Sequence, residues 1–146
     1  ALTHLKELYI PGCSVADISF VSGMKELEFL DFQINSVADL SPLSGLTNLT
    51  TLSMCSIPAT DISPLSGLIN LQELFLFSVV ADDFTPLSGL TNLVFLDLTH
   101  TGISDLTPLS GLTNLKVLSL AGNPIEDYSP IAEIYPNLEG KDFTMR

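Results

Sequence analysis

Positively charged residues are scarce in this chain. Only five of its 146 residues are Lys or Arg, against seventeen Asp or Glu, and the formal net charge is −12. Between residues 26 and 115 there is no Lys or Arg, whereas ten Asp or Glu lie in that stretch. Such a field repels phosphate groups, which excludes nucleic acid and anionic lipid surfaces as partners.

Long apolar runs are also missing. No unbroken one is longer than that at residues 74–77, far below the roughly 18 residues that a membrane span needs. Membrane insertion is therefore excluded. The chain begins without an initiator Met or a basic-then-apolar leader, so we expect a processed protein or an excised fragment. Its hydrophobic fraction of 46% fits one folded domain over residues 1–146.

A repeat of 22 residues runs through the chain, with first positions at Leu5, Leu27, Leu49, Leu71, Leu93 and Leu115. Counted from that Leu as offset zero, the residues at offsets 3, 5, 10, 13, 16 and 19 are apolar in nearly every repeat. The alternation at offsets 3 and 5 predicts a short strand at the start of each repeat.

The second half of each repeat predicts a helical turn. Five of the six repeats carry Ser or Thr followed by Pro, as in Ser41-Pro42, a pattern typical of an N-cap and a first helical residue. A Gly follows three residues after the Pro, as at Gly45, which leaves room for one 3₁₀ or α-helical turn.

A single repeat cannot fold alone. Burying seven apolar side chains stabilises it by roughly 10–20 kcal/mol, while ordering some twenty residues costs roughly 20–40 kcal/mol. Repeats stacked at the ~4.8 Å strand spacing share their cores. The predicted fold is an α/β repeat solenoid with a parallel concave sheet and short 3₁₀ or helical turns on the convex side. A partial unit over 138–146, with a strand between Leu138 and Phe143, is expected to close it.

The block Asp-Ile-Ser-Pro-Leu-Ser-Gly-Leu-Ile-Asn-Leu at residues 61–71, which returns in similar form at 39–49 and 105–115, resembles the 22-residue leucine-rich repeat of the bacterial internalins. The resemblance covers residues 2–138. It implies a secreted or surface-associated bacterial protein that binds a protein partner through its concave face. A cytoplasmic location stays open, because most of the pattern serves folding.

One position departs from the family. Internalin repeats usually have Asn at offset eight, where the amide binds turn backbone, but here only Asn35 and Asn123 do. Ile57 and Val79 take that place in the third and fourth repeats, so we expect those turns to satisfy their backbone groups differently.

The strand alternation places offsets two, four and six on the concave face, facing water. Aromatic residues recur there, and those on adjacent strands are expected to form a contiguous patch of the kind that marks interaction sites. The predicted protein-binding residues are Tyr9, Phe29, Asp31, Glu73, Phe75, Phe77, Phe95 and Asp97.

The acidic members of this set, Asp31, Glu73 and Asp97, favour a basic partner and would orient it. Two alternatives stay open at this stage: the aromatic residues stabilise the sheet or face a cap, or the whole domain is a passive spacer that displays another part of a longer surface protein. We expect a monomer that carries no cofactor.

A complete column of aspartates occupies offset twelve, at Asp17, Asp39, Asp61, Asp83, Asp105 and Asp127. Stacked carboxylates are possible calcium ligands. We favour a structural role, because Asp two residues before Ser/Thr-Pro can accept hydrogen bonds from turn backbone. We therefore expect no metal site.

The residues needed for catalysis are too far apart. Cys13 is expected at a buried turn position, and Cys55 lies two repeats away, roughly 10 Å, which is beyond the reach of a disulfide. Both are expected to be free thiols. His4 and His100 lie about 10 Å or more from Cys55 by the same spacing. No phosphate-binding glycine loop or Ser-His-Asp arrangement occurs, so we expect no enzymatic activity.

Overall fold

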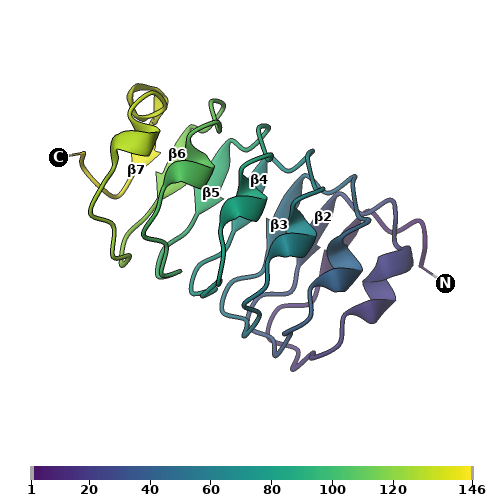
Figure 1. Ribbon diagram of the computed structural model, residues 1–146. Helices are drawn as coiled ribbons and strands as arrows, with labels where there is room; N and C mark the ends of the chain where they lie inside the picture. Colours follow the sequence, from purple (N-terminus) through teal and green to yellow (C-terminus); the bar gives the residue numbers. More distant parts are fainter. Residues whose placement is uncertain (1, 146) are drawn as a thin grey trace.

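Seven short strands form one open parallel sheet within residues 2–145, the part of the chain that the computed structural model describes (Figure 1). Residues 1 and 146, the ends of the expected domain, lie outside the described residues. Strand order follows chain order, and every neighbouring pair is parallel. The strands are β1 (Glu7–Tyr9), β2 (Phe29–Asp31), β3 (Thr51–Ser53), β4 (Glu73–Phe75), β5 (Phe95–Asp97), β6 (Val117–Ser119) and β7 (Gly140–Lys141).

Short 3₁₀ turns cover the other side of the molecule, in front of the strands in Figure 1. This arrangement confirms the predicted solenoid of sheet and helical turns. The turns are η1 (Ser19–Gly23), η2 (Ser41–Leu43), η3 (Ser63–Leu65), η4 (Thr85–Leu87), η5 (Thr107–Leu109), η6 (Ser129–Ile131) and η7 (Tyr135–Asn137).

The repeat sets the register of the sheet. From β1 to β6 each residue pairs with the residue 22 positions later, as Leu30 does with Leu52, so side chains of one offset stack in a column. The leucines at offsets zero and three are fully buried from the second to the sixth repeat. In the first repeat Leu5, Leu8 and Ile10 are only half-buried, because they have a neighbouring repeat on one side only among the described residues.

The last strand arrives one residue late, as the displaced Leu138 predicts. Val117 pairs with Gly140, 23 positions later. After β7 a side chain supplies the next hydrogen-bond acceptor at the edge of the sheet. Asp142 Oδ1 accepts a hydrogen bond from Leu120 N at 2.7 Å. In an earlier repeat the equivalent N–H, that of Leu76, donates to the main-chain oxygen of Asp97. The carboxylate of Asp142 thus replaces the next strand's carbonyl.

The predicted Ser/Thr N-caps are wrong in detail. Ser41 is the first residue of η2, its predecessor Leu40 occupies the cap position, and no side-chain cap bond forms there. Instead Asp39 Oδ1 accepts a hydrogen bond from Ser41 N at 2.9 Å. The same bond recurs in all six repeats at 2.7–2.9 Å, so the aspartate column has the structural role expected of it.

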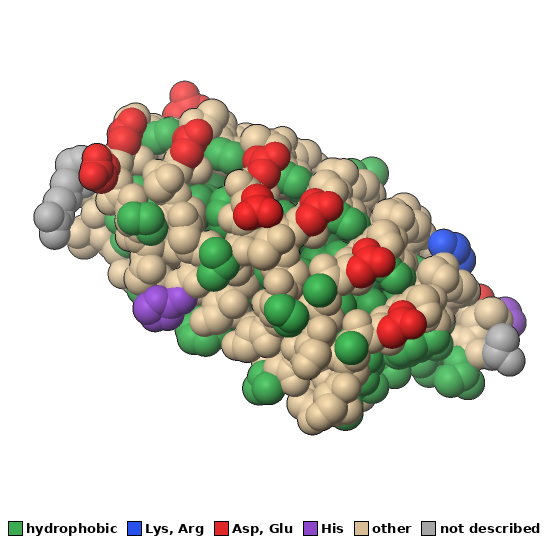
Figure 2. Space-filling view, turned by 60° about the horizontal axis from the view of Figure 1, so that its bottom comes forward, with side chains coloured by type: hydrophobic (Ala, Val, Ile, Leu, Met, Phe, Trp, Pro, Cys, Tyr) green, Lys and Arg blue, Asp and Glu red, His purple; other side chains and the backbone are tan. Residues whose placement is uncertain are grey.

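The aspartate column lies along the loops that lead into the 3₁₀ turns, and Figure 2 shows acidic side chains following one another along the molecule. Hydrogen bonds from the backbone and side chain of Ser41 lower the pKa of Asp39, although the charges of Asp17 and Asp61 act to raise it. The other five aspartates also have lowered pKa values, from bonds to their own Ser or Thr. No cluster suited to a metal ion occurs among residues 2–145.

Two asparagines organise the turns at the ends of the solenoid. Asn35 is buried. Its Oδ1 accepts hydrogen bonds from Cys13 N and Val15 N at 3.0 and 2.9 Å. Its Nδ2 donates to the main-chain oxygens of Ile10 and Phe32 at 2.8 Å each. Asn123 makes a similar set of bonds in the last two repeats, with Gly102 N as its second backbone donor in place of the N–H one residue later.

The fourth repeat satisfies the same turn without an asparagine, as expected. Val79 N donates directly to Leu76 O at 2.9 Å, and the Val79 side chain is fully buried. In the fifth repeat the Thr101 hydroxyl donates to Leu98 O at 2.8 Å, in addition to the bonds from Asn123 of the next repeat.

The residue at offset seven has a left-handed backbone in all six repeats. Glycine suits this conformation, but Ile34 adopts it with φ +56° while 64% of the residue is exposed. A β-branched residue is strained there. The column consists of Gly12, Ile34, Ser56, Ser78, His100 and Gly122.

Replacing Asn35 by alanine should lower the free energy of unfolding by about 2–4 kcal/mol, because several buried backbone groups lose their partner at once. Asn48→Ala is the control: the exposed Asn48 side chain donates one hydrogen bond, to Lys25 O, and its loss should cost about 1 kcal/mol or less. Urea unfolding followed by circular dichroism measures both. Equal losses would contradict the proposed role of Asn35.

Ile34→Asn should raise the free energy of unfolding by about 1 kcal/mol, because asparagine tolerates a left-handed backbone better than isoleucine does. Ile69→Asn is the matched control, since Ile69 is 55% exposed but lies outside the left-handed region. Thermal and urea unfolding measure the free energy of unfolding of the two variants. A stabilisation of both to the same degree would show that the loss of an exposed apolar side chain, and not the relief of backbone strain, is responsible.

The aspartate column predicts loss of stability in acid. Its carboxyls have lower pKa values in the folded chain than their ordinary value near 3.9. Their contribution is therefore complete above about pH 5 and is lost as the pH falls through the folded pKa values. At high salt, which screens repulsion among carboxylates, the urea concentration at the unfolding midpoint should decrease once the pH is lowered below 4. The fall should be smaller in Asp61→Asn than in Glu133→Gln, and a midpoint unchanged down to pH 2 would refute the prediction.

Candidate functional site

The concave face of the sheet carries the side chains at offsets two, four and six. The leucines between them point into the core and are buried, which confirms the predicted alternation. Parallel pairing aligns the offset-four residues into one row: Tyr9, Asp31, Ser53, Phe75, Asp97 and Ser119. The offset-two row, in the same order, is Glu7, Phe29, Thr51, Glu73, Phe95 and Val117.

The aromatic residues of this face form two pairs of the same geometry. The rings of Tyr9 and Phe29 stack with centroids 4.6 Å apart and planes inclined by 22°. The rings of Phe75 and Phe95 lie 4.8 Å apart, inclined by 34°. Each pair joins offset four of one strand to offset two of the next, so the two pairs lie diagonally across β1–β2 and β4–β5.

Phe75 and Phe95 thus lie together on adjacent strands, as predicted, and Tyr9 and Phe29 form a second group on β1 and β2. Phe77 lies beyond the end of β4, is 39% exposed and meets His100 edge to face at 5.8 Å. Tyr9 is the most exposed aromatic residue of the face, at 63%, whereas Phe29, Phe75 and Phe95 are half-buried by their neighbours. Much of the ring surface still faces outward, but part of it stabilises the sheet, as the alternative interpretation expects.

A hollow of about 300 Å³ lies between the two aromatic pairs, above β3. The small side chains of Thr51 and Ser53 form its floor, because they are the concave-face residues of the strand that separates the pairs. The full lining is Tyr9, Phe29, Asp31, Gln33, Thr51, Ser53, Cys55, Glu73 and Phe75. The sequence places Gln33, Thr51, Ser53 and Cys55 on this face, but nothing in their residue types indicates that they line a hollow.

Asp31 corrects one expectation. We predicted that it faces water, but it is only 5% exposed. Its Oδ1 accepts a hydrogen bond from Gln33 N at 3.0 Å, and its Oδ2 one from Gln33 Nε2 at 3.2 Å. Asp31 is therefore a buried member of the lining of the hollow, together with Tyr9 and Phe29.

The other two predicted carboxylates differ in exposure. Glu73 is exposed, and its Oε2 accepts a hydrogen bond from Thr51 Oγ1 at 3.2 Å. Asp97 is half-buried, and its Oδ1 accepts one from Thr99 N at 2.9 Å. All three acidic residues differ in exposure but lie on the same face as the aromatic residues, as predicted, because the register of the strands places them there.

The cysteines are free thiols, as expected, but Cys13 is exposed and not buried in a turn. The Asn35 side chain bonds Cys13 through its backbone N–H, so the sulfur is left on the outside. Cys55 is half-buried beside the hollow. Burial raises the pKa of its thiol, and the charges of Asp97 and Asp31 contribute in the same direction.

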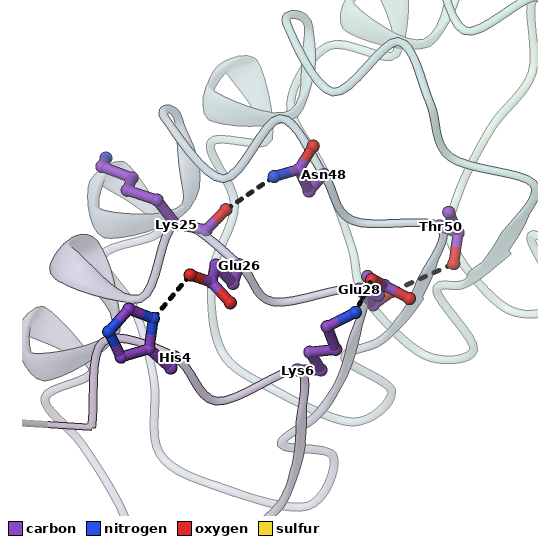
Figure 3. A network of polar contacts seen from close by, with 7 residues as sticks. All are labelled: His4, Lys6, Lys25, Glu26, Glu28, Asn48 and Thr50. Carbon is purple, nitrogen blue, oxygen red and sulfur yellow. Dashed lines mark hydrogen bonds and ion pairs between the residues drawn. The ribbon is translucent and has the colours of Figure 1, made fainter.

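The ion pairs of the described residues lie at the two ends of the solenoid. Figure 3 shows the N-terminal group, in which Lys6 Nζ lies 3.2 Å from Glu28 Oε1 and His4 Nδ1 lies 2.6 Å from Glu26 Oε1. The remaining pair joins Lys116 to Glu139 at 4.0 Å. None of these pairs in residues 2–145 involves a carboxylate of the hollow.

None of the helical segments in residues 2–145 has the length and apolar character that crossing a membrane requires.

Comparison with known proteins identifies the repeat. A family model described as leucine-rich repeats in two copies matches residues 25–67 and 91–133, more than half of the chain. A search of curated proteins returned no match.

Solved structures with this fold include two internalins of Listeria monocytogenes. The internalin inlF is 32% identical and superposes with a TM-score of 0.87 over 96% of this chain and 48% of its own. Internalin C2 is 36% identical, with a TM-score of 0.81 over 89% of this chain and 57% of its own. The chain thus spans about half the length of these internalins. A leucine-rich repeat protein of Leptospira interrogans shares the fold at 24% identity and a TM-score of 0.78.

Leucine-rich repeat proteins generally act in protein–protein recognition, and they are typically not enzymes. The 22-residue register, the parallel sheet with its short 3₁₀ turns, and the matches to the family model and to the two internalins agree with one another. The chain therefore belongs to the leucine-rich repeat family, with repeats of the bacterial internalin type.

Proposed function

We propose that this domain recognises a protein partner through its concave face, with the two aromatic pairs as anchors. The observation that carries the proposal is the placement of Tyr9–Phe29 and Phe75–Phe95 on either side of a hollow. The sheet is held by its buried leucine columns, so it presents these rings on a rigid surface. Aromatic side chains dominate the binding energy of many interfaces for their large apolar area.

Charge supports a basic partner. The chain has a net charge of −12, and the concave face carries Asp31, Glu73 and Asp97. An acidic surface accelerates association with a basic protein and disfavours acidic ones. The similarity to the two Listeria internalins further supports a bacterial protein that acts at the cell surface or after secretion.

A distant structure illustrates what the fold can do. The plant peptide hormone receptor RGFR1, 22% identical with a TM-score of 0.71, was solved in complex with RGF2. At this identity the likeness concerns the fold alone. It supports the general use of such a solenoid for binding a polypeptide, and the residues of the present concave face have to carry the specific proposal.

The triple variant Phe75→Ser, Phe77→Ser, Phe95→Ser should reduce capture of the partner by tenfold or more, because interface aromatics often contribute about 2 kcal/mol each. Affinity capture with quantitative mass spectrometry compares it with the unsubstituted chain. The control, Phe20→Ser with Ile69→Ser, removes exposed apolar side chains away from the concave strands.

Circular dichroism must first establish that both variants are folded. Capture of the same proteins in the same amounts by the triple variant would refute recognition through these rings. That result would leave a passive spacer as the better account of the domain.

A further inference from the structure

The hollow between the aromatic pairs has walls and a floor of different chemistry. Phe29 and Tyr9 lie on one side and Phe75 on the other, while Thr51 and Ser53 on β3 keep the floor low. The strands that carry the two walls, β2 and β4, are two spacings or roughly 10 Å apart. A flat group that contacts rings on both sides needs about 3.5–4 Å on each side. Two such contacts span about 7–8 Å, so a spacing of roughly 10 Å between the wall strands leaves room for one planar head group.

Negative charge is concentrated at this place. The buried Asp31 is part of the lining, and each of its carboxylate oxygens accepts one hydrogen bond from Gln33, which leaves further lone pairs for a second donor. Glu73 stands at the exposed edge. Asp97 lies on the neighbouring strand of the same face, where Phe75 pairs with it in register.

Within residues 2–145 no Lys or Arg forms an ion pair with these carboxylates. Residues 26–115 contain no Lys or Arg, and in the described part of the chain the ion pairs engage Glu26, Glu28 and Glu139 instead. A buried carboxylate between aromatic walls, without a basic side chain of its own, is complementary to a cation from outside.

Building on the function proposed above, we propose that the hollow is a pocket for an arginine side chain of the protein partner. A guanidinium is planar and stacks on aromatic faces, and its fork of N–H donors matches a carboxylate. In the bound state it would lie between Phe29 and Phe75 and donate to Asp31, with Glu73 closing the exposed side. The aromatic pairs would then provide both apolar contact area and specificity for the cation.

Nuclear magnetic resonance tests the pocket without knowledge of the partner. Acetyl-arginine methylamide is titrated into the isotope-labelled chain, and acetyl-citrulline methylamide, which has the same shape without the charge, is titrated in parallel. We expect saturable shifts at the backbone amides of Asp31, Ser53 and Cys55 with the arginine compound, with a Kd in the millimolar range typical of about 4 kcal/mol. The citrulline compound should bind at least tenfold more weakly.

Variants then test the carboxylates. Asp31→Asn and Glu73→Gln should each weaken the arginine compound several-fold, whereas Glu126→Gln, on the exposed loop after β6, should leave its binding unchanged. The amide spectra of the variants report whether the fold is retained. Equal binding of the arginine and citrulline compounds, or shifts spread over the whole acidic surface, would overturn the proposal.

The outcome is separable from that of the proposed function. If the arginine compound fails to bind but the triple aromatic variant loses its partner, recognition by the concave face stands and the arginine pocket is refuted. If arginine binds in the hollow but the aromatic variant captures its partner normally, the hollow binds cations without contributing to recognition. In that case both the proposed function and the role of a partner arginine are refuted.

Discussion

From β1 to β6 each strand is hydrogen-bonded to a strand 22 residues away, and the position of nearly every side chain follows from that register. Because Leu30 pairs with Leu52 and Leu52 with Leu74, the leucines form continuous buried columns. The same pairing forces the residues between them onto the concave face. Diversity on that face is therefore compatible with a constant core, since the two sets of positions never exchange places.

The register explains which features could be predicted from the sequence. The fold, the buried columns, the late arrival of β7 and the membership of the concave face all follow from periodicity alone. The burial of Asp31 does not, because it depends on how the neighbouring side chains pack around this position. The diagonal pairing of Phe75 with Phe95 also depends on side-chain rotamers, which a pattern of apolar and polar residues does not specify.

Local hydrogen bonding explains the wrong cap assignment. A Ser or Thr before Pro is typical of an N-cap, whose side-chain oxygen accepts from the backbone N–H two or three residues later. Here Leu43 N and Ser44 N donate to main-chain oxygens instead. The charged carboxylate of Asp39 accepts from Ser41 N, which precedes both of them. The residue that satisfies the turn is thus the one two positions earlier. The stacked aspartates repel one another, as the effect of Asp17 and Asp61 on Asp39 illustrates, and the bonds to the turns offset that repulsion.

The 22-residue register also limits how such a domain can change its length. Duplication or deletion of one whole repeat would add or remove a strand while every remaining column kept its neighbours. A shift of a single residue has a different effect, as β7 shows. This strand pairs with residues 23 positions earlier and has only two residues in the sheet. Beyond it the Asp142 side chain accepts the next hydrogen bond. The span of the recognition surface can accordingly grow or shrink only in discrete steps of one repeat.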